Sequence, residues 1–162
     1  MESNDPSIQN LGEFITALCA GTRLHICLHD ITGITDCRHF EIDGRNRIHS
    51  GSLCDHAKHT RKGLALCLRC KDYCNRKALS GESFTGRCPM GITEIVRPVV
   101  LGHQVAGILY IGNLVENYTD FRSRVERTCT FTGVSRQTIL EAYPTAQFCS
   151  DLSPYEAVAD AL

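Results

Sequence analysis

Two adjacent segments rich in isoleucine and valine constrain the fold of this chain more than any other feature. They cover residues 92–101 and 104–111, and only Gly102 and His103 separate them. Isoleucine and valine favour β-strands, and a two-residue connection that contains glycine is typical of a tight hairpin. Pro98 has no backbone N–H to donate, so we expect the first strand to lie at a sheet edge or a bulge there. The sequence therefore predicts an antiparallel sheet built on this hairpin.

The remaining segments alternate between helical and strand patterns. Residues 7–20 repeat apolar side chains at intervals of three and four, which indicates a helix, whereas residues 24–29 alternate as a strand does. The serines in residues 50–52 are expected to cap a short helix that carries Cys54 and His56. We further expect a second strand over residues 35–42 and helices over residues 63–80, 121–130, 135–143 and 154–162. This order is that of an α+β fold in which helices flank an antiparallel sheet and the C-terminus is helical.

The composition is that of an ordinary globular protein, and we expect residues 1–162 to form a single domain. Hydrophobic residues make up 43% of the 162 residues and the net charge is -1, so the chain has no general attraction to nucleic acid or to an anionic membrane. It has no apolar run of the roughly 20 residues that a bilayer span requires, and its first residues are unlike a signal peptide. We therefore expect a cytoplasmic protein that neither enters a membrane nor binds nucleic acid directly.

Cysteine is unusually frequent, with ten in the chain, and five of them lie in the stretch from Cys54 to Cys88. In a reducing cytosol such residues are thiols or metal ligands rather than disulfides. Each one taken alone is also explained as a small apolar side chain in the core, because free cysteine is among the most buried residue types. As a group they indicate metal or redox chemistry, and this stretch is the expected centre of function.

Helix geometry limits which of the five cysteines can share a metal ion. Cys67 and Cys70 lie about 4.5 Å apart along a helix axis, whereas Cys67 and Cys74 lie about 10.5 Å apart. A metal site needs thiolate sulfurs about 2.3 Å from each ion, so all three cannot bind one ion on an unbroken helix. We therefore expect the metal ligands to be Cys54, Cys67, Cys70 and Cys88. Cys74 is then a spare ligand or a core thiol.

The kind of metal stays open on sequence grounds. Zinc is one candidate for the bound metal, although the spacing of the four cysteines matches no standard zinc ribbon. An iron–sulfur cluster is the second, because the Cys88-Pro89 pair is similar to the end of bacterial ferredoxin motifs, and haem is the third. His56 lies near the cysteines and is either a further ligand or a solvated side chain of a basic helix. His25 and His29 share one face of the predicted first strand with Cys27, and this face meets either a pocket or solvent.

Several short motifs follow one another in a distinctive order. They are Cys67-Leu-Arg-Cys70, Arg87-Cys88-Pro-Met-Gly91, Val96-Arg-Pro-Val99, Val105-Ala-Gly-Ile108 and a tail over residues 132–143. In this order and spacing they resemble the PocR-type sensory domain, and with the shorter matches between them they cover about residues 50–143. Relatives often have histidine directly after the last cysteine of this set, where this chain has Pro89. Whatever that histidine does in relatives therefore cannot be carried over.

The resemblance implies a PAS-like antiparallel sheet flanked by helices that binds a small organic effector. Relatives occur in AraC-type regulators and sensor kinases, so it also implies a DNA-binding or kinase output domain on the same polypeptide, with this bacterial sensory domain cut from a longer protein. We expect a homodimer in which Cys88, Met90, Gly91 and His56 contact the effector.

Two other classes of function stay open. In the first, a cysteine-bound zinc or iron–sulfur centre is itself the receptor, and the protein is a redox or metal sensor without an organic effector. In the second, Cys88 beside Arg87 is a reactive catalytic thiol. No HExxH, Ser-His-Asp or paired-carboxylate pattern stands out, so we expect a sensor rather than an enzyme.

Overall fold

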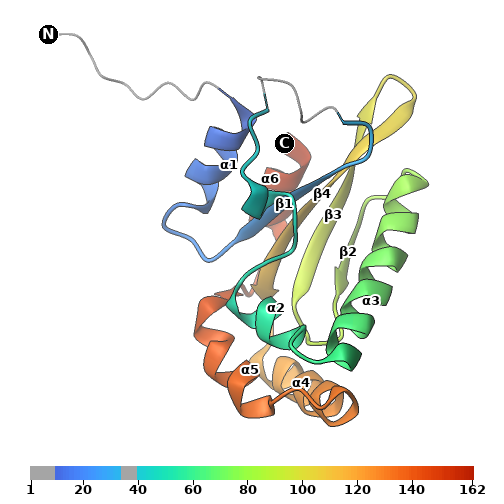
Figure 1. Ribbon diagram of the computed structural model, residues 1–162. Helices are drawn as coiled ribbons and strands as arrows, with labels where there is room; N and C mark the ends of the chain where they lie inside the picture. The colour runs from blue at the N-terminus through green and yellow to red at the C-terminus, as the bar shows by residue number, and fades with distance from the viewer. Residues whose placement is uncertain (1–9, 34–39) are drawn as a thin grey trace, which may run out of the picture.

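The computed structural model describes residues 10–33 and 40–162. Within these residues a five-stranded sheet forms the centre, with strand order β1-β4-β3-β2 and β5 beside the end of β4 (Figure 1). All strand pairs are antiparallel except the short β4–β5 pair. The strands are β1 (His25–Asp30), β2 (Phe84–Arg87), β3 (Thr93–Leu101), β4 (Gln104–Val115) and β5 (Gln147–Phe148).

Helices cover both faces of the sheet and one of its ends. In Figure 1, α1 and α6 lie on one face, α3 lies on the other, and α2, α4 and α5 gather at the lower end. The helices are α1 (Leu11–Cys19), α2 (Ser52–Ala57), α3 (Arg61–Leu79), α4 (Tyr118–Thr132), α5 (Arg136–Ala142) and α6 (Ser153–Ala161), with short 3-10 turns η2 (Gly44–Asn46) and η3 (Tyr143–Thr145). The predicted α+β class, an antiparallel sheet flanked by helices with a helical C-terminus, is confirmed.

Alternation along the strands divides the core into two layers. Ile26 of β1 and Ile95 of β3 face α1 and α6, whereas Cys27 of β1 and Val96 of β3 face α3 together with Tyr110 of β4. Each large apolar side chain buried in this way contributes about 2 kcal/mol to folding before the entropy of ordering the chain is counted. Because both faces are covered, the side chains that β1 and β3 direct toward α3 lie in a largely buried environment.

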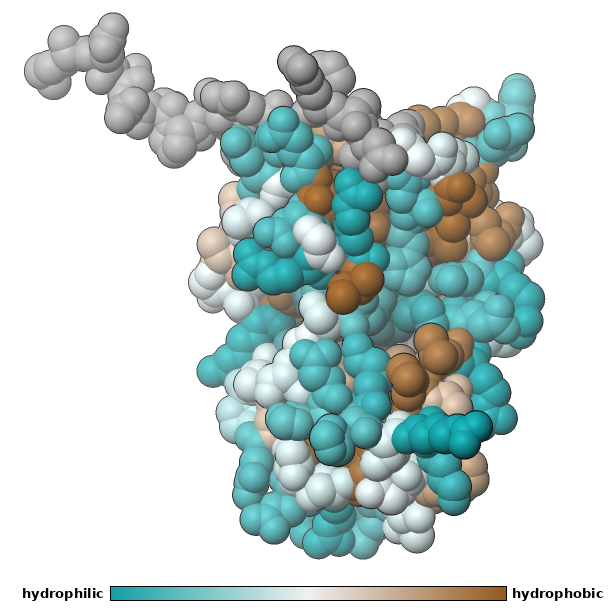
Figure 2. Space-filling model, viewed as in Figure 1, coloured by the Kyte–Doolittle hydropathy of each residue, from teal (hydrophilic) through white to brown (hydrophobic). Residues whose placement is uncertain are grey.

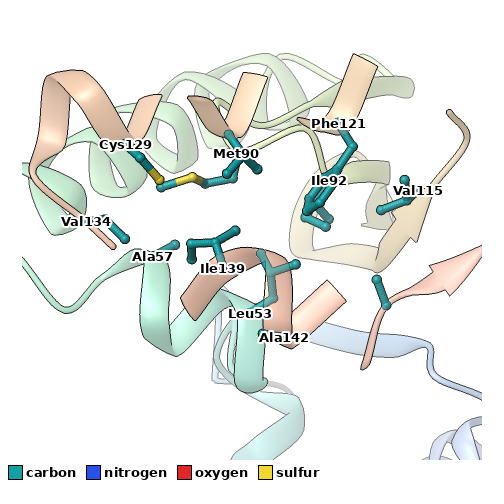
Figure 3. Close-up of a cluster of buried hydrophobic side chains, with 12 residues drawn as sticks. Leu53, Ala57, Met90, Ile92, Val115, Phe121, Cys129, Val134, Ile139 and Ala142 are labelled. Atoms are coloured by element: carbon teal, nitrogen blue, oxygen red, sulfur yellow. The ribbon is translucent and has the colours of Figure 1, made fainter. Parts of the chain in front are cut away.

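A third cluster joins the helical end to the sheet. Figure 3 shows Met90, Ile92 and Phe121 pointing toward Leu53 and Ile139, so that α2, α4 and α5 close over the start of β3. The cluster thus fixes α2 and α4 close to the turn that precedes β3.

That turn requires Gly91, whose φ is 88°. A Cβ atom on Gly91 would lie 3.1 Å from the Cα atom of Phe121. Glycine is therefore required here for two reasons: it adopts the left-handed backbone conformation without strain, and it leaves room for α4 to pack closely.

One local prediction needs correction, and a second is tested only in part. The serines in residues 50–52 do not cap α2, because its N-cap is Gly51 and no side chain accepts a capping hydrogen bond. Instead, the backbone N–H of Gly51 donates a hydrogen bond to the Asp55 carboxylate at 3.3 Å. The predicted strand over residues 35–42 falls mostly on residues 34–39, outside the described part, and residues 40–42 are not in a strand. The partner of β1 is β4, which is long enough to pair with β1 along its whole length.

The prediction for Pro98 is confirmed. The β2–β3 ladder ends at the Phe84–Val96 pair, so β3 is an edge strand on that side at Pro98. The β3–β4 register also shifts nearby, between Val99 and Val100.

The helices in the described ranges include none that is long and apolar enough to cross a bilayer. On the face shown in Figure 2, hydrophobic residues form separate islands among hydrophilic ones.

Candidate ligand-binding site

A cavity of about 60 Å³ lies where the start of β3 meets α2, α3 and α4. Part of its wall is apolar and includes Leu53, Ala57, Leu66, Met90 and Ile92. Another part is polar and includes His49, Lys58, Lys71, Glu94 and Thr128. A space of this size holds a few water molecules or one molecule of a few heavy atoms.

The four cysteines predicted as metal ligands all line this cavity. α3 carries Cys67 and Cys70 one turn apart, α2 carries Cys54, and Cys88 directly follows β2. Cys74 does not line the cavity and packs between α3 and the sheet. The nine cysteines in the described ranges are all free thiols. The four therefore share one cavity, and their role as metal ligands stays a prediction.

The protein environment keeps the cavity thiols protonated. Burial raises the pKa of Cys54 to about 12 and also raises the pKa values of Cys67 and Cys88. The pKa of Cys70 is raised by its hydrogen bond with Cys74 and by burial. The sulfurs are therefore uncharged near neutral pH, and each would have to lose a proton to bind a metal ion.

A compact charge network forms the polar side of the cavity. One carboxylate oxygen of Glu94 lies 2.9 Å from Nδ1 of His49, and the other lies 3.3 Å from Nζ of Lys71. Nζ of Lys71 also lies 2.7 Å from Nε2 of His49 and 3.5 Å from the centroid of the Tyr110 ring. Burial raises the pKa of Glu94, but the hydrogen bond from His49 and the charges of His49 and Lys71 outweigh it and lower the pKa to about 2. The cavity thus presents an ionised carboxylate beside an ammonium group.

Two of the four residues predicted to contact an effector line the cavity. Cys88 and Met90 do so, whereas Gly91 is buried in the turn beside Phe121 and His56 lies on the exposed side of α2. The structure brings Cys88 and Met90 to the cavity and leaves His56 outside its wall, and the contact with an effector stays a prediction for all four.

The polar wall was missed by the sequence interpretation. Glu94 does carry a signal, because it is the one acidic residue in a strand made mostly of Ile, Val, Leu and Pro, and acidic side chains are rarely buried. His49 and Lys71 carry no such signal: His49 lies in an irregular segment, and Lys71 is one of several basic residues on α3. Their proximity to Glu94 depends on the tertiary fold.

A second group of potential metal ligands lies next to this network. Cys27 and His29 of β1 and His49, which precedes α2, have ligand atoms that all lie within 4.8 Å of one another. Across the described residues this is the one group of three or more that meets this distance, and the four cavity cysteines do not belong to it. His49 therefore takes part in both arrangements.

Comparison with protein families matches residues 7–160 of the chain to a model described as the sensory domain found in PocR. The matched range includes every strand and every cavity-lining residue. Comparison with curated proteins and with solved structures gives no match.

Proposed function

The chain belongs to the family of the sensory domain found in PocR, and we propose that it receives its signal as a small organic effector bound in the cavity between β3, α2, α3 and α4. A sensory role follows from the family. The observation that supports this location is the wall of the cavity, which combines an apolar side with a few fixed polar groups, as small-molecule sites commonly do.

The size and charges of the cavity restrict the effector. About 60 Å³ admits a molecule of only a few heavy atoms unless the surrounding helices separate. The carboxylate of Glu94 offers a hydrogen-bond acceptor and Lys71 offers donors, and these two charges already balance one another. A neutral molecule with one or two polar groups and an apolar part fits this wall best, because an additional buried charge would lack a partner.

The effector would act on an output domain through α6. Arg97 of β3 lies 2.6 Å from Asp160 of α6, and Thr85 of β2 donates a hydrogen bond to Glu156 of α6 at 2.9 Å. Glu94 and Arg97 lie on the same strand, so a shift of β3 at the cavity reaches the C-terminal helix directly. In this proposal a DNA-binding or kinase domain on the same polypeptide reads the position of α6, and the sensor acts as a homodimer.

Thermal unfolding in the presence of small alcohols, diols, aldehydes and amides tests the proposal. A compound that binds the folded state raises the melting temperature in a concentration-dependent way. Ala57→Val adds two methyl groups at the cavity wall and should abolish the rise, whereas Ala65→Val, the same change at an exposed position on α3, should preserve it. A rise of equal size in both variants would show that the compound binds elsewhere, and no rise with any compound would contradict an organic effector of this size.

A metal or cluster sensor is the second candidate, because all four predicted cysteines line one cavity. Anaerobic purification followed by absorbance, metal and sulfide analysis separates the two candidates. Stoichiometric iron and sulfide that disappear in the Cys67→Ser/Cys70→Ser double variant would replace the organic effector by a cluster as the receptor. A colourless protein without bound zinc would remove the metal hypothesis for these cysteines.

A further inference from the structure

We propose that Cys27, His29 and His49 form a separate binding site for a thiophilic, four-coordinate metal ion of the zinc class, on the side of β1 that faces α3. The site shares no ligand with the four cavity cysteines. It adjoins the cavity through His49, which lines the cavity wall, and it does not require an organic effector. It rests on the convergence of three side chains whose chemistry suits such an ion.

The strand supplies two of the ligands in a fixed relation. Cys27 and His29 are two residues apart on β1, so their side chains leave the same face of the sheet. β1 pairs with β4 over all six residues, and the Cys27 side chain is fully buried. The backbone positions of these two ligands are therefore determined by the sheet rather than by a mobile loop.

Two hydrogen bonds hold the third ligand over the strand. Nδ2 of Asn46 donates to the carbonyl of Ile26 at 2.7 Å, and Nε2 of His25 lies 2.9 Å from the carbonyl of Ile48. These contacts fasten the segment before α2 to β1 on both sides of Arg47 and directly before His49. The ligand atoms of the group lie within 4.8 Å of one another, whereas ligands of a tetrahedral zinc ion lie about 3.5 Å apart, so small side-chain rotations complete the site.

The surroundings of His49 are those of a metal ligand. Its Nδ1 faces the carboxylate of Glu94 at 2.9 Å, which leaves Nε2 to bind an ion and orients the ring. The ring of Tyr110 packs against both imidazoles, with centroids 4.9 Å from His29 and 4.8 Å from His49. An acceptor behind one nitrogen and an aromatic ring against each imidazole restrict the rotation of both ligands.

The ion must displace the Lys71 side chain from His49 in order to bind. Its Nζ lies 2.7 Å from Nε2 of His49, and Glu94 and the face of Tyr110 stabilise the ammonium charge there. A positive group thus lies against the nitrogen that would bind the ion, and the two compete for it. When the ion binds, the Lys71 side chain swings away, the Cys27 thiol gives its proton to solvent, and a water molecule completes the coordination.

Anaerobic titration of the reduced full chain with Co²⁺ and with Zn²⁺ tests the site. Tetrahedral Co²⁺ absorbs visible light and its bond to a thiolate adds a near-ultraviolet band, so both stoichiometry and ligand type are measured. We expect the Cys67→Ser/Cys70→Ser variant to retain one ion with one thiolate. His29→Gln and His49→Gln should each weaken its binding by more than the roughly 10–100-fold typical of an outer-shell change. His103→Gln, an exposed histidine in the turn between β3 and β4 that lies outside the group, should leave the affinity unchanged.

Lys71→Met separates a metal site from a purely structural polar cluster. Removal of the competing ammonium should tighten Co²⁺ binding at least tenfold, whereas circular dichroism should show the same fold. Weaker binding in Lys71→Met, unchanged binding in His49→Gln, or the loss of all Co²⁺ in the Cys67→Ser/Cys70→Ser variant would each overturn the proposal. Because the two histidine variants alter partly exposed side chains, they remain informative if a substitution of buried Cys27 does not fold.

Discussion

The carboxylate of Glu94 and Nδ1 of His49 lie 2.9 Å apart, with only 12% of each side chain exposed. A carboxylate removed from water in this way is stable only when donors and positive charge replace its hydration. Lys71 supplies the second contact, at 3.3 Å. The three side chains therefore stabilise one another, and a change in His49 or in Lys71 leaves the Glu94 carboxylate with one of its two partners.

Glu94→Gln should flatten the acid dependence of stability. Folding lowers the pKa of Glu94 from 4.5 to about 2, so the carboxylate contributes roughly 3 kcal/mol above pH 4.5, and this contribution disappears as the pH falls from 4.5 toward 2. The variant should be less stable by about 3 kcal/mol at neutral pH and should lose less stability in this window. Urea unfolding with a chelator at pH 7, 4.5 and 3 measures the difference.

Asp151→Asn is a suitable control, because the pKa of Asp151 is lowered by hydrogen bonds from Ser153 at an exposed position away from the cavity. Its effect on the same curves should be small. Parallel stability curves for the wild-type protein and Glu94→Gln between pH 4.5 and 3 would contradict an ionised Glu94 in the folded state.

Much of the fold was predictable because it depends on local patterns. The hairpin over residues 92–101 and 104–111 corresponds to β3 and β4, and the helix over residues 63–80 corresponds to α3, because β-branched density and turn chemistry act over a few residues. The pairing of β1 with β4 was not predictable in the same way, because the partner of a strand is chosen by long-range packing.

The part of the candidate site that depends on local geometry was predictable, and the part that depends on the tertiary fold was not. Helix geometry sufficed to group Cys67 with Cys70 and to set Cys74 apart, and all four selected cysteines line one cavity. His49 was not identified, because nothing in its neighbours in the chain indicates that it reaches β1. Sites assembled from distant segments are visible in sequence only when their residue types are rare and closely spaced.

Gly91→Ala should destabilise the protein more than Gly102→Ala. Both glycines have positive φ, at 88° and 62°, which alanine adopts at a cost of about 1 kcal/mol. The added methyl group at Gly102 meets open space, whereas at Gly91 it lies 3.1 Å from the backbone of Phe121 and forces α4 to move, for a total of about 2–4 kcal/mol. Urea denaturation of both variants measures the difference, and equal losses would show that α4 does not pack closely on this turn.

Cys54 should react slowly with iodoacetamide in the folded protein. Burial raises its pKa from 9.0 to about 12, so at a given pH in the neutral range its thiolate fraction is about 1000-fold lower than in the unfolded chain. Mass spectrometry of peptides after timed labelling at pH 8 gives the rate, and the urea-unfolded protein provides the reference. Similar rates in the two states would mean that α2 opens readily and exposes the cavity.

Asp160→Asn should loosen α6 with little effect on global stability. Asp160 is largely exposed and its contact with Arg97 should contribute at most about 1 kcal/mol, but it is the ion pair that joins β3 to the last helix. Hydrogen exchange of α6 amides should accelerate, because local opening requires less free energy than global unfolding. Glu126→Gln removes the exposed Arg136–Glu126 pair at the other end of the molecule and should leave α6 unchanged. If α6 amides exchange equally in Asp160→Asn and in the wild-type protein, the apolar contacts of α6 alone hold it, and β3 does not act on this helix through Arg97.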